Sequence, residues 1–255
     1  MKLLSLTNDA VFKNFFTEES KDLLIHFLQA VLELPSGEIK DITILNPEFP
    51  KLSIDDRGLI VDLYAKTKSG EIFHVEMQVQ NHKFFTERIT LYHSRAYSTQ
   101  LTKGSNFKEI KKTVSVIVTD FVMIEDSPNY HNSFMWKNDE GILLTDVQQI
   151  HILELPKIPV EAINDKELWL KLFKAKEESE VDQIVEQSPI MKQAGVRLKE
   201  LSADEKIREE ARVRDDAQWL SWLPTARKTR REAVTVGFDQ RFTTVHLGQT
   251  RVEND

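Results

Sequence analysis

The chain contains no cysteine among its 255 residues, which excludes disulfide bonds and thiolate metal sites such as zinc fingers. A chain of this kind fits a reducing compartment, and we expect a cytoplasmic protein. Long apolar runs are also absent, because no window approaches the roughly 18 continuous apolar residues of a membrane helix. The N-terminal segment MKLLSLTNDAVFKNFF lacks the apolar core of a secretion signal. We therefore expect neither secretion nor contact with a membrane.

Positive charge is scarce, since 34 lysine and arginine residues stand against 41 aspartate and glutamate residues, a formal net charge of −7. A protein that coats nucleic acid through its overall charge carries the opposite sign. The balance argues against that mode of binding and leaves local contacts with DNA open. The hydrophobic content of 40% is sufficient for a buried core. We expect a globular protein with one large or two small domains.

Helix and strand signals alternate along the first 160 residues. Helices are predicted over 9–16, 21–34 and 82–101, and strands over 38–46, 59–65, 71–80, 113–123 and 151–155. The segment 113–123 is rich in β-branched residues, as in a strand that is covered on both faces. This mixed order predicts an α/β fold with a small mixed sheet flanked by helices.

The composition changes twice in the second half of the chain. From Ile163 onward lysine, glutamate and aspartate dominate a helical pattern, which we interpret as two or three helices with a solvated face. From Ser221 onward lysine and glutamate nearly vanish, and ARKTRR forms a small basic cluster. We hypothesise a frame shift or junction there and expect the tail to be unstructured. The predicted organisation is a core over 1–160, a charged helical extension over 161–220 and an atypical basic tail over 221–255.

The most informative segment is 59–80, LIVDLYAKTKSGEIFHVEMQVQ, because it has the alternating pattern of a β-hairpin. If Lys68-Ser69-Gly70 forms a three-residue loop with Gly70 in the left-handed conformation, Thr67 pairs with Glu71. That register sets Asp62 directly opposite Glu76. Cross-strand Cβ atoms lie about 4.5–5.5 Å apart, so two carboxylates avoid repulsion there only if a positive charge lies between them. A divalent cation would supply that charge.

The same register predicts further ligands for such a cation. Mg²⁺ accepts carboxylate, carbonyl and water oxygens, and we expect the backbone carbonyl of Met77 to join Asp62 and Glu76 as a ligand. Gln78 lies two residues after Glu76 and points to the same face. At such a site Mg²⁺ lowers the pKa of a bound water and neutralises charge on a phosphodiester. Taken alone, however, a solvent-exposed polar face explains these acids more often than a metal site does.

Five segments resemble, in order, motifs of the Rpn family of recombination-promoting nucleases, transposases of the PD-(D/E)XK nuclease superfamily. The segments are NDAVFKNFF, VDLYA, GEIFHVEMQ, FFTERITLYHSRAYSTQL and IKKTVSVIVTDF, and the resemblance covers about residues 1–220. It implies a restriction-endonuclease-like PD-(D/E)XK core with a helical C-terminal extension. It also implies a Mg²⁺-dependent DNA endonuclease associated with recombination and mobile elements.

The resemblance assigns roles to single residues. It implies that Asp62 and Glu76 are the two acids of the motif and that Gln78 occupies the position usually held by lysine. Asp9 and Lys13 match the N-terminal helix motif, and Arg88, Tyr92 and Tyr97 match the helix after the hairpin. The predicted catalytic residues are therefore Asp62, Glu76, Gln78, Lys13 and Asp9, the metal ligands Asp62, Glu76 and Met77, and the DNA contacts Arg88 and Tyr92.

The departure from the superfamily pattern is Gln78. A lysine there would orient the attacking water and stabilise the charged transition state, whereas a neutral glutamine only donates or accepts hydrogen bonds. Lys13, Arg88 or Lys66 could supply the positive charge instead. Lys13 has the best claim through its motif, and Lys66 the weakest because it lies about 13 Å along the strand from Asp62.

Structural interpretations of these residues stay open beside the functional ones. Asp9 could stabilise a helix N-terminus, Arg88 could pair with an acid at the surface, and Tyr92 and Tyr97 fit core aromatics better than base-stacking groups. We interpret His74 as the partner of a neighbouring acid.

Two alternatives to DNA cleavage also remain. One is an inactive nuclease-like module, a transposase relic that binds DNA or a partner protein, and the other is a helical adaptor that acts through the C-terminal region. Whether the protein forms a homodimer is open as well.

Overall fold

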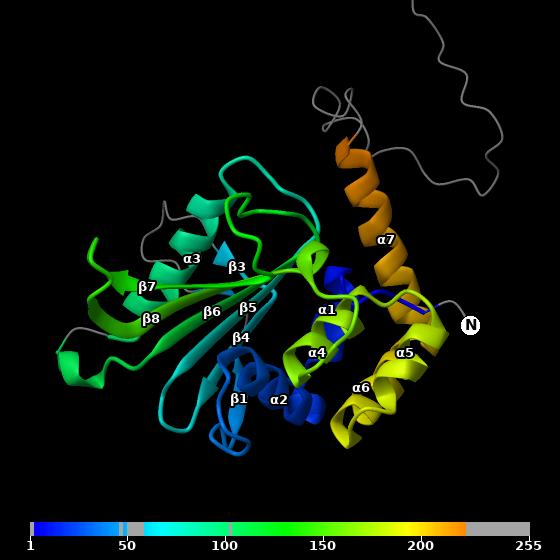
Figure 1. The fold of residues 1–255 in the computed structure, drawn as a ribbon, viewed down its shortest axis with the longest axis horizontal. Helices are drawn as coiled ribbons and strands as arrows, with labels where there is room; N and C mark the ends of the chain where they lie inside the picture. Colours follow the sequence, from blue (N-terminus) through cyan, green and yellow to red (C-terminus); the bar gives the residue numbers. More distant parts are fainter. Residues whose placement is uncertain (1–2, 46–47, 50–58, 102–103, 223–255) are drawn as a thin grey trace, which may run out of the picture. The chain divides into compact units, whose positions relative to one another are not determined.

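The structure is a computed structural model that describes residues 3–45, 48–49, 59–101 and 104–222 (Figure 1). The chain divides into two compact units, residues 1–215 and 216–255. In the second unit the described residues are 216–222, the last part of a helix that begins at Glu205. The prediction of an unstructured tail over 221–255 therefore falls outside the described residues, apart from Ser221 and Trp222.

The first unit contains a six-stranded sheet with the strand order β1-β4-β5-β6-β8-β7. Its strands are β1 (Ile42–Leu45), β4 (Leu63–Thr67), β5 (Ile72–Gln78), β6 (Thr113–Thr119), β7 (His131–Lys137) and β8 (Leu143–Glu154). The β5–β6 and β6–β8 pairs are parallel, and the β1–β4, β4–β5 and β7–β8 pairs are antiparallel. Two short strands, β2 (Glu48–Phe49) and β3 (Leu59–Ile60), pair separately. The mixed sheet confirms the predicted α/β class.

Seven α-helices accompany these strands in the described residues. They are α1 (Asp9–Phe15), α2 (Lys21–Leu32), α3 (Phe85–Ser98), α4 (Asp165–Lys174), α5 (Glu178–Val185), α6 (Pro189–Ala203) and α7 (Glu205–Trp222). Helix α3 contacts β5 and β6, whereas α1 contacts β5 and α2 contacts β1. Figure 1 shows α3 on one face of the sheet and α1, α2 and α4 on the other. Among the described residues, none of the helices combines the length and the apolar character that spanning a membrane requires.

The main core lies between the sheet and α1, α2, α4 and α6. Its centre is a group of aromatic rings whose neighbouring centroids lie 4.9–6.4 Å apart: Phe12, Phe15, Phe16, Phe27, Trp169 and Phe173. The indole Nε1–H of Trp169 donates to His26 Nδ1 at 2.9 Å, so the one polar atom of that ring is satisfied. Helix α4 thus packs against α1 and α2 in one core, although it belongs to the charged second half of the sequence. This packing fixes α1 beneath the sheet.

The predicted hairpin register is confirmed for Leu63–Lys66, but the ladder stops before Asp62, so the predicted Asp62–Glu76 pair is not part of it. Leu63 pairs with Val75 and Lys66 with Ile72, and the N–H of Thr67 donates to the carbonyl of Glu71 at 2.9 Å. Gly70 has φ +98°, the left-handed conformation that a three-residue hairpin loop requires.

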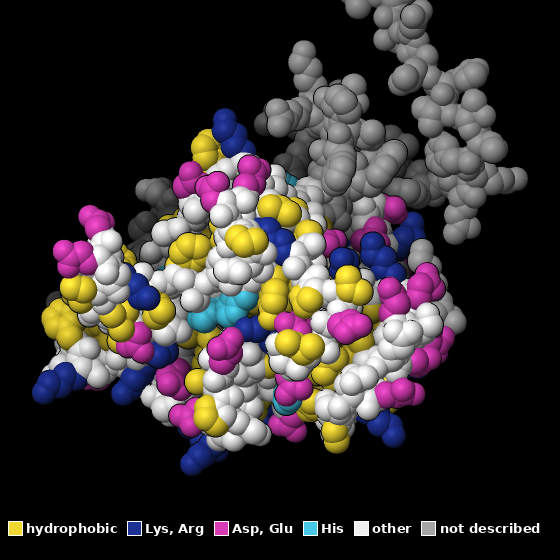
Figure 2. Space-filling model, in the orientation of Figure 1, with side chains coloured by type: hydrophobic (Ala, Val, Ile, Leu, Met, Phe, Trp, Pro, Cys, Tyr) yellow, Lys and Arg dark blue, Asp and Glu magenta, His cyan; other side chains and the backbone are white. Residues whose placement is uncertain are grey.

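One prediction about strands is wrong, and another is confirmed but too short. The strand expected over 59–65 breaks at a bend around Asp62, and Val61 does not pair with Met77 because the Asp62 side chain takes the Met77 N–H. The strand expected over 151–155 is β8, which is much longer, and its partner β7 was not predicted. Both strands extend to an exposed end of the sheet, where apolar side chains lie in solvent among polar ones and obscure the pattern (Figure 2). The exposed apolar residues there are Phe134, Trp136, Ile142, Leu143 and Leu144.

Candidate active site

Four side chains meet where α1 lies against the end of the hairpin opposite its loop. Asp62 comes from the bend before β4, Glu76 and Gln78 from β5, and Lys13 from the last turn of α1. The Nζ atom of Lys13 lies 3.2 Å from Asp62 Oδ1, and the Nε2 amide of Gln78 donates to Glu76 Oε2 at 2.9 Å. The structure therefore brings together the four residues that the sequence places closest to the proposed chemistry.

The two acids are buried rather than solvated. Glu76 is 5% exposed, and the Asp62 side chain is 11% exposed. The two carboxyl groups are neighbours, since the charge of Glu76 acts on Asp62. The alternative interpretation, in which these acids lie on a polar strand face in solvent, is wrong because α3 covers this face of β5. Buried carboxylates without a full set of ionic partners are costly.

Electrostatics at Asp62 favour a further positive charge. Burial raises the pKa of Asp62 to about 7, and the negative charge of Glu76 acts in the same direction. The charge of Lys13 and the hydrogen bond from Met77 oppose this rise without cancelling it. The local field at Asp62 thus stays negative even with a lysine at 3.2 Å. A cation between the two acids would relieve that field.

Glu76 behaves differently from its neighbour. Burial acts to raise its pKa, but the hydrogen bond and charge of His74, the hydrogen bond from Asp62 and the charge of Arg88 outweigh burial and lower it. Glu76 therefore favours the carboxylate form, and Asp62 favours the protonated form. Two adjacent carboxyl groups that share one proton behave in this way. A cation bound by both carboxyl groups would replace such a proton.

The backbone of Met77 is free of the β4–β5 ladder, because the last pair of that ladder is Leu63–Val75. Its N–H donates to Asp62 Oδ2 at 3.0 Å. Even-numbered residues of β5 direct their backbone to β6, as the bond from the N–H of Ile72 to the carbonyl of Lys112 shows. The Met77 carbonyl consequently faces the Asp62 side of the strand.

Asp9 lies at the outer rim of the site. It begins α1 directly after the N-cap Asn8, whose side chain accepts from the N–H groups of Ala10 and Val11. Its carboxylate lies 3.7 Å from Lys13 Nζ and 3.6 Å from Nε of Arg214 in α7. Asp9 thus reaches the two acids through Lys13, while its position also suits the dipole of the helix.

The three candidate residues of α3, Arg88, Tyr92 and Tyr97, lie further from the two acids than Lys13 and Gln78 do. Arg88 lies over the ring of Phe85, 5.0 Å from its centroid, and its charge reaches Glu76. Tyr92 is half-buried, packs against Val61, Ile72 and Ala96, and has its ring 6.2 Å from that of His74. Tyr97 is half-buried, and no contact in the described part of the chain joins it to the acids. Lys66 is exposed near the hairpin loop, away from the site.

Two residues of the site carry no signal that we recognised in the sequence. His93 of α3 and Ser115 of β6 are both buried, and Ser115 Oγ bonds to His74 Nδ1 at 3.1 Å and to His93 Nδ1 at 2.9 Å. A buried position for His93 follows from its place on the apolar stripe of the helix, four residues after Ile89. Its partner lies on another strand, and nothing in the local sequence indicates it.

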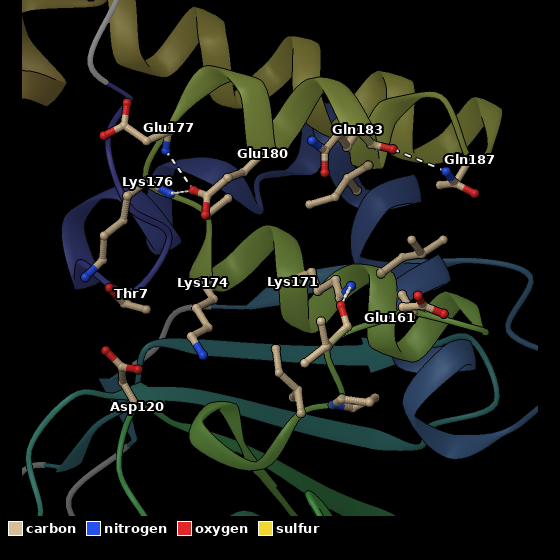
Figure 3. A pocket seen from close by; sticks show the side chains of 17 residues that line it. Thr7, Asp120, Glu161, Lys171, Lys174, Lys176, Glu177, Glu180, Gln183 and Gln187 are labelled. Atoms are coloured by element: carbon tan, nitrogen blue, oxygen red, sulfur yellow. Dashed lines mark hydrogen bonds between the residues drawn. The ribbon is translucent and has the colours of Figure 1, made fainter.

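A groove of about 970 Å³ begins beside the site (Figure 3). Its wall includes Asp120, whose N–H donates to the carbonyl of Gln78 at 2.8 Å. Figure 3 shows Lys174 and Lys176 in this groove near Asp120 and Thr7. Glu177 and Glu180 lie beside Lys176, so the charge of the groove is mixed. The lining of the groove does not include the two acids.

The donor set fits one hard cation. Within the described residues no group of three or more histidine, cysteine, aspartate or glutamate side chains is arranged to hold a metal. Two carboxylates and a backbone carbonyl, completed by water, are nevertheless the oxygen ligands that Mg²⁺ takes. Each of the four carboxylate oxygens has a protein donor in the structure: Lys13, Met77, His74 and Gln78. A carboxylate oxygen has two lone pairs, so each can also bind a cation.

The mixed sheet, the paired acids on its hairpin and the flanking helices define a nuclease-like α/β core. Residues 6–223 match the model of a protein family described as PD-(D/E)XK nuclease family transposase. The chain belongs to that family, which confirms the relationship that the five sequence segments indicated. Comparison with curated proteins and with solved structures finds no match.

Proposed function

We propose that this protein is a Mg²⁺-dependent DNA endonuclease that acts in the cytoplasm in recombination or the movement of genetic elements. The observation that carries the proposal is the buried pair Asp62 and Glu76, in which burial and then the charge of Glu76 raise the pKa of Asp62 to about 7 beside a lysine. An acid pair with a purely structural role gains no stability from burial beside a second carboxyl group. In a metal site the same burial is useful, because it strengthens the attraction between the two carboxylates and a divalent cation.

Asp62, Glu76 and the Met77 carbonyl would hold the cation, which when bound would polarise a phosphodiester and make a water molecule more acidic. Lys13 contributes positive charge beside Asp62, which suits stabilisation of the charge that develops on the phosphate. Gln78 is held by Glu76 and has its carbonyl oxygen left to orient a water. Asp9 holds Lys13 from the rim. Arg88 and Tyr92 are proposed to contact DNA from α3.

The test is nicking of supercoiled plasmid by the full chain with Mg²⁺, alongside Asp62→Asn and Glu76→Gln. We expect nicking by the native protein, no nicking in EDTA, and a loss of at least about 100-fold in each variant, as for groups that act directly on a transition state. Equal nicking by all three proteins would identify a contaminant and overturn the proposal. Because two strand cuts need two such sites, sedimentation of the protein with and without DNA would show whether a homodimer supplies them.

A second candidate is an inactive module that binds DNA. The neutral Gln78 favours it, since its amide is already bonded to Glu76 and brings no charge to the site. The deciding variant is Gln78→Lys, assayed beside the native chain for DNA binding and for nicking with Mg²⁺. Nicking by Gln78→Lys alone would assign the binding role to the native protein. Nicking by both would retain the enzyme.

A further inference from the structure

A buried row of polar side chains runs inward from the proposed site, between β5, β6 and α3. His74 Nε2 lies 3.2 Å from Glu76 Oε1, His74 Nδ1 lies 3.1 Å from Ser115 Oγ, and Ser115 Oγ lies 2.9 Å from His93 Nδ1. His74 and Ser115 are fully buried, and His93 is 4% exposed. Three polar side chains in succession beneath a helix are unusual in a small core and cost free energy to desolvate.

The direction of the first hydrogen bond follows from chemistry. A Glu76 side chain that holds a cation is a carboxylate, and a carboxylate only accepts hydrogen bonds. The Nε2 atom of His74 must therefore carry the proton and donate it to Glu76 Oε1. This holds for both charge states of the ring. Ser115 can meet Nδ1 as donor or as acceptor because a hydroxyl rotates to suit either.

The row fixes the ring as well as the carboxylate. Ser115 holds the far nitrogen of His74, and His93 holds Ser115, so the imidazole cannot turn about its axis without breaking a buried bond. Tyr92 covers the same ring at 6.2 Å between centroids. Gln78 then binds the second oxygen of Glu76 at 2.9 Å. Both oxygens of the carboxylate are thereby held in place, and Glu76 is directed toward Asp62.

We propose that His74, locked by Ser115 and His93, is a positioning residue that presents the Glu76 carboxylate to the divalent cation of the proposed active site. The inference rests on the proposed function, because it concerns the same cation. His74 does not contact the metal or the DNA. It acts through Glu76, in the way that outer partners of metal ligands set the orientation of those ligands.

The experiment is Mn²⁺ binding to the full chain by isothermal titration calorimetry, with no DNA present. We expect His74→Leu to weaken Mn²⁺ binding by about 10-fold or more. In His74→Gln the side-chain amide can reach the place of Nε2 and donate to Glu76, so we expect affinity within about threefold of the native value. His151→Gln is the matched control, since His151 is a buried histidine of β8 outside the site. It should lose stability and keep the native affinity.

The outcomes separate the two proposals. If the native chain binds no Mn²⁺, the proposed function fails. If the native chain binds Mn²⁺ and folded His74→Leu binds it equally well, the proposed function stands and the positioning role is overturned. Nitrogen-15 chemical shifts of the imidazole rings give a readout that needs no metal: the signal of His74 Nε2 should be that of a protonated nitrogen. A bare Nε2 would also overturn the inference.

Discussion

Replacing Asp62 with asparagine should stabilise the metal-free protein while it destroys the proposed site. A carboxyl group with a pKa of about 7 instead of 3.8 costs the folded state about 4 kcal/mol when charged at pH 7.5. Asparagine has nearly the same shape and no charge, and its Oδ1 can still accept from the Met77 N–H. The loss of the ion pair with Lys13 at 3.2 Å offsets part of this gain in stability. We expect a net gain of about 2 kcal/mol in the free energy of unfolding.

The pH dependence has a defined sign. The folded-state pKa of Asp62 is raised, so the folded protein keeps a proton between about pH 4 and 7 that the unfolded chain has lost. Native stability therefore falls as the pH rises through this window, and the asparagine variant has no such fall. Urea unfolding in EDTA should show the gain of about 2 kcal/mol at pH 7.5 and well under about 1 kcal/mol at pH 5. A variant that is less stable than the native protein at both pH values would refute the reasoning and show that the Lys13 ion pair dominates.

The same pair of proteins reports on the cation. A ligand that binds only the folded state at 100 times its dissociation constant stabilises it by about 2.7 kcal/mol. Mg²⁺ should therefore raise the unfolding midpoint of the native protein and leave that of Asp62→Asn unchanged. In EDTA the variant would then be more stable than the native chain. At saturating Mg²⁺ the native chain would be as stable as the variant or more stable.

Three further predictions concern other parts of the molecule. Gly195→Ala should destabilise the protein by about 1–3 kcal/mol in urea unfolding, because the added Cβ would lie 2.2 Å from Val185 Cγ1. The control Val196→Ala, at an exposed position, should destabilise it far less. Equal losses in the two variants would contradict the close contact between Gly195 and Val185. Burial lowers the pKa of His93 and of His151 from 6.5 to about 4. Their contribution to the free energy of unfolding is therefore fully present above about pH 6.5 and is lost toward pH 4, with a loss of about 2 kcal/mol each at pH 5. Urea unfolding in the Asp62→Asn background isolates this loss, and a stability that does not change with pH would contradict it. Lys13→Met should reduce nicking about 100-fold with little change in Mn²⁺ affinity, and unchanged nicking would exclude a role for this lysine.

Much of the fold could be predicted because its signals are local. The loop Lys68-Ser69-Gly70 and the alternation on both sides of it determine the hairpin register, and that register puts Glu76 and Gln78 on one face. The apolar run of β6 indicates a strand covered on both sides. These features depend on neighbours within a few residues, and the structure agrees with them.

The remainder depends on contacts distant in sequence. The bend at Asp62 forms because its side chain bonds to Met77, which periodicity cannot indicate. The burial of His74 and Glu76 comes from α3, and the partner of His74 is Ser115, 41 residues further along the chain. Strand β7 was missed because its apolar side chains Phe134 and Trp136 are exposed. In each case a tertiary contact overrides the local pattern.

The most direct test of the account is a crystal of the native chain soaked in Mn²⁺, with anomalous diffraction used to locate the ion. We predict an anomalous peak between Asp62 and Glu76, with an oxygen of each about 2.0–2.3 Å from the ion, and with Lys13 still beside Asp62. A well-ordered site without a peak, or an ion bound elsewhere with none between the two acids, would contradict the claim that this pair exists to hold a metal.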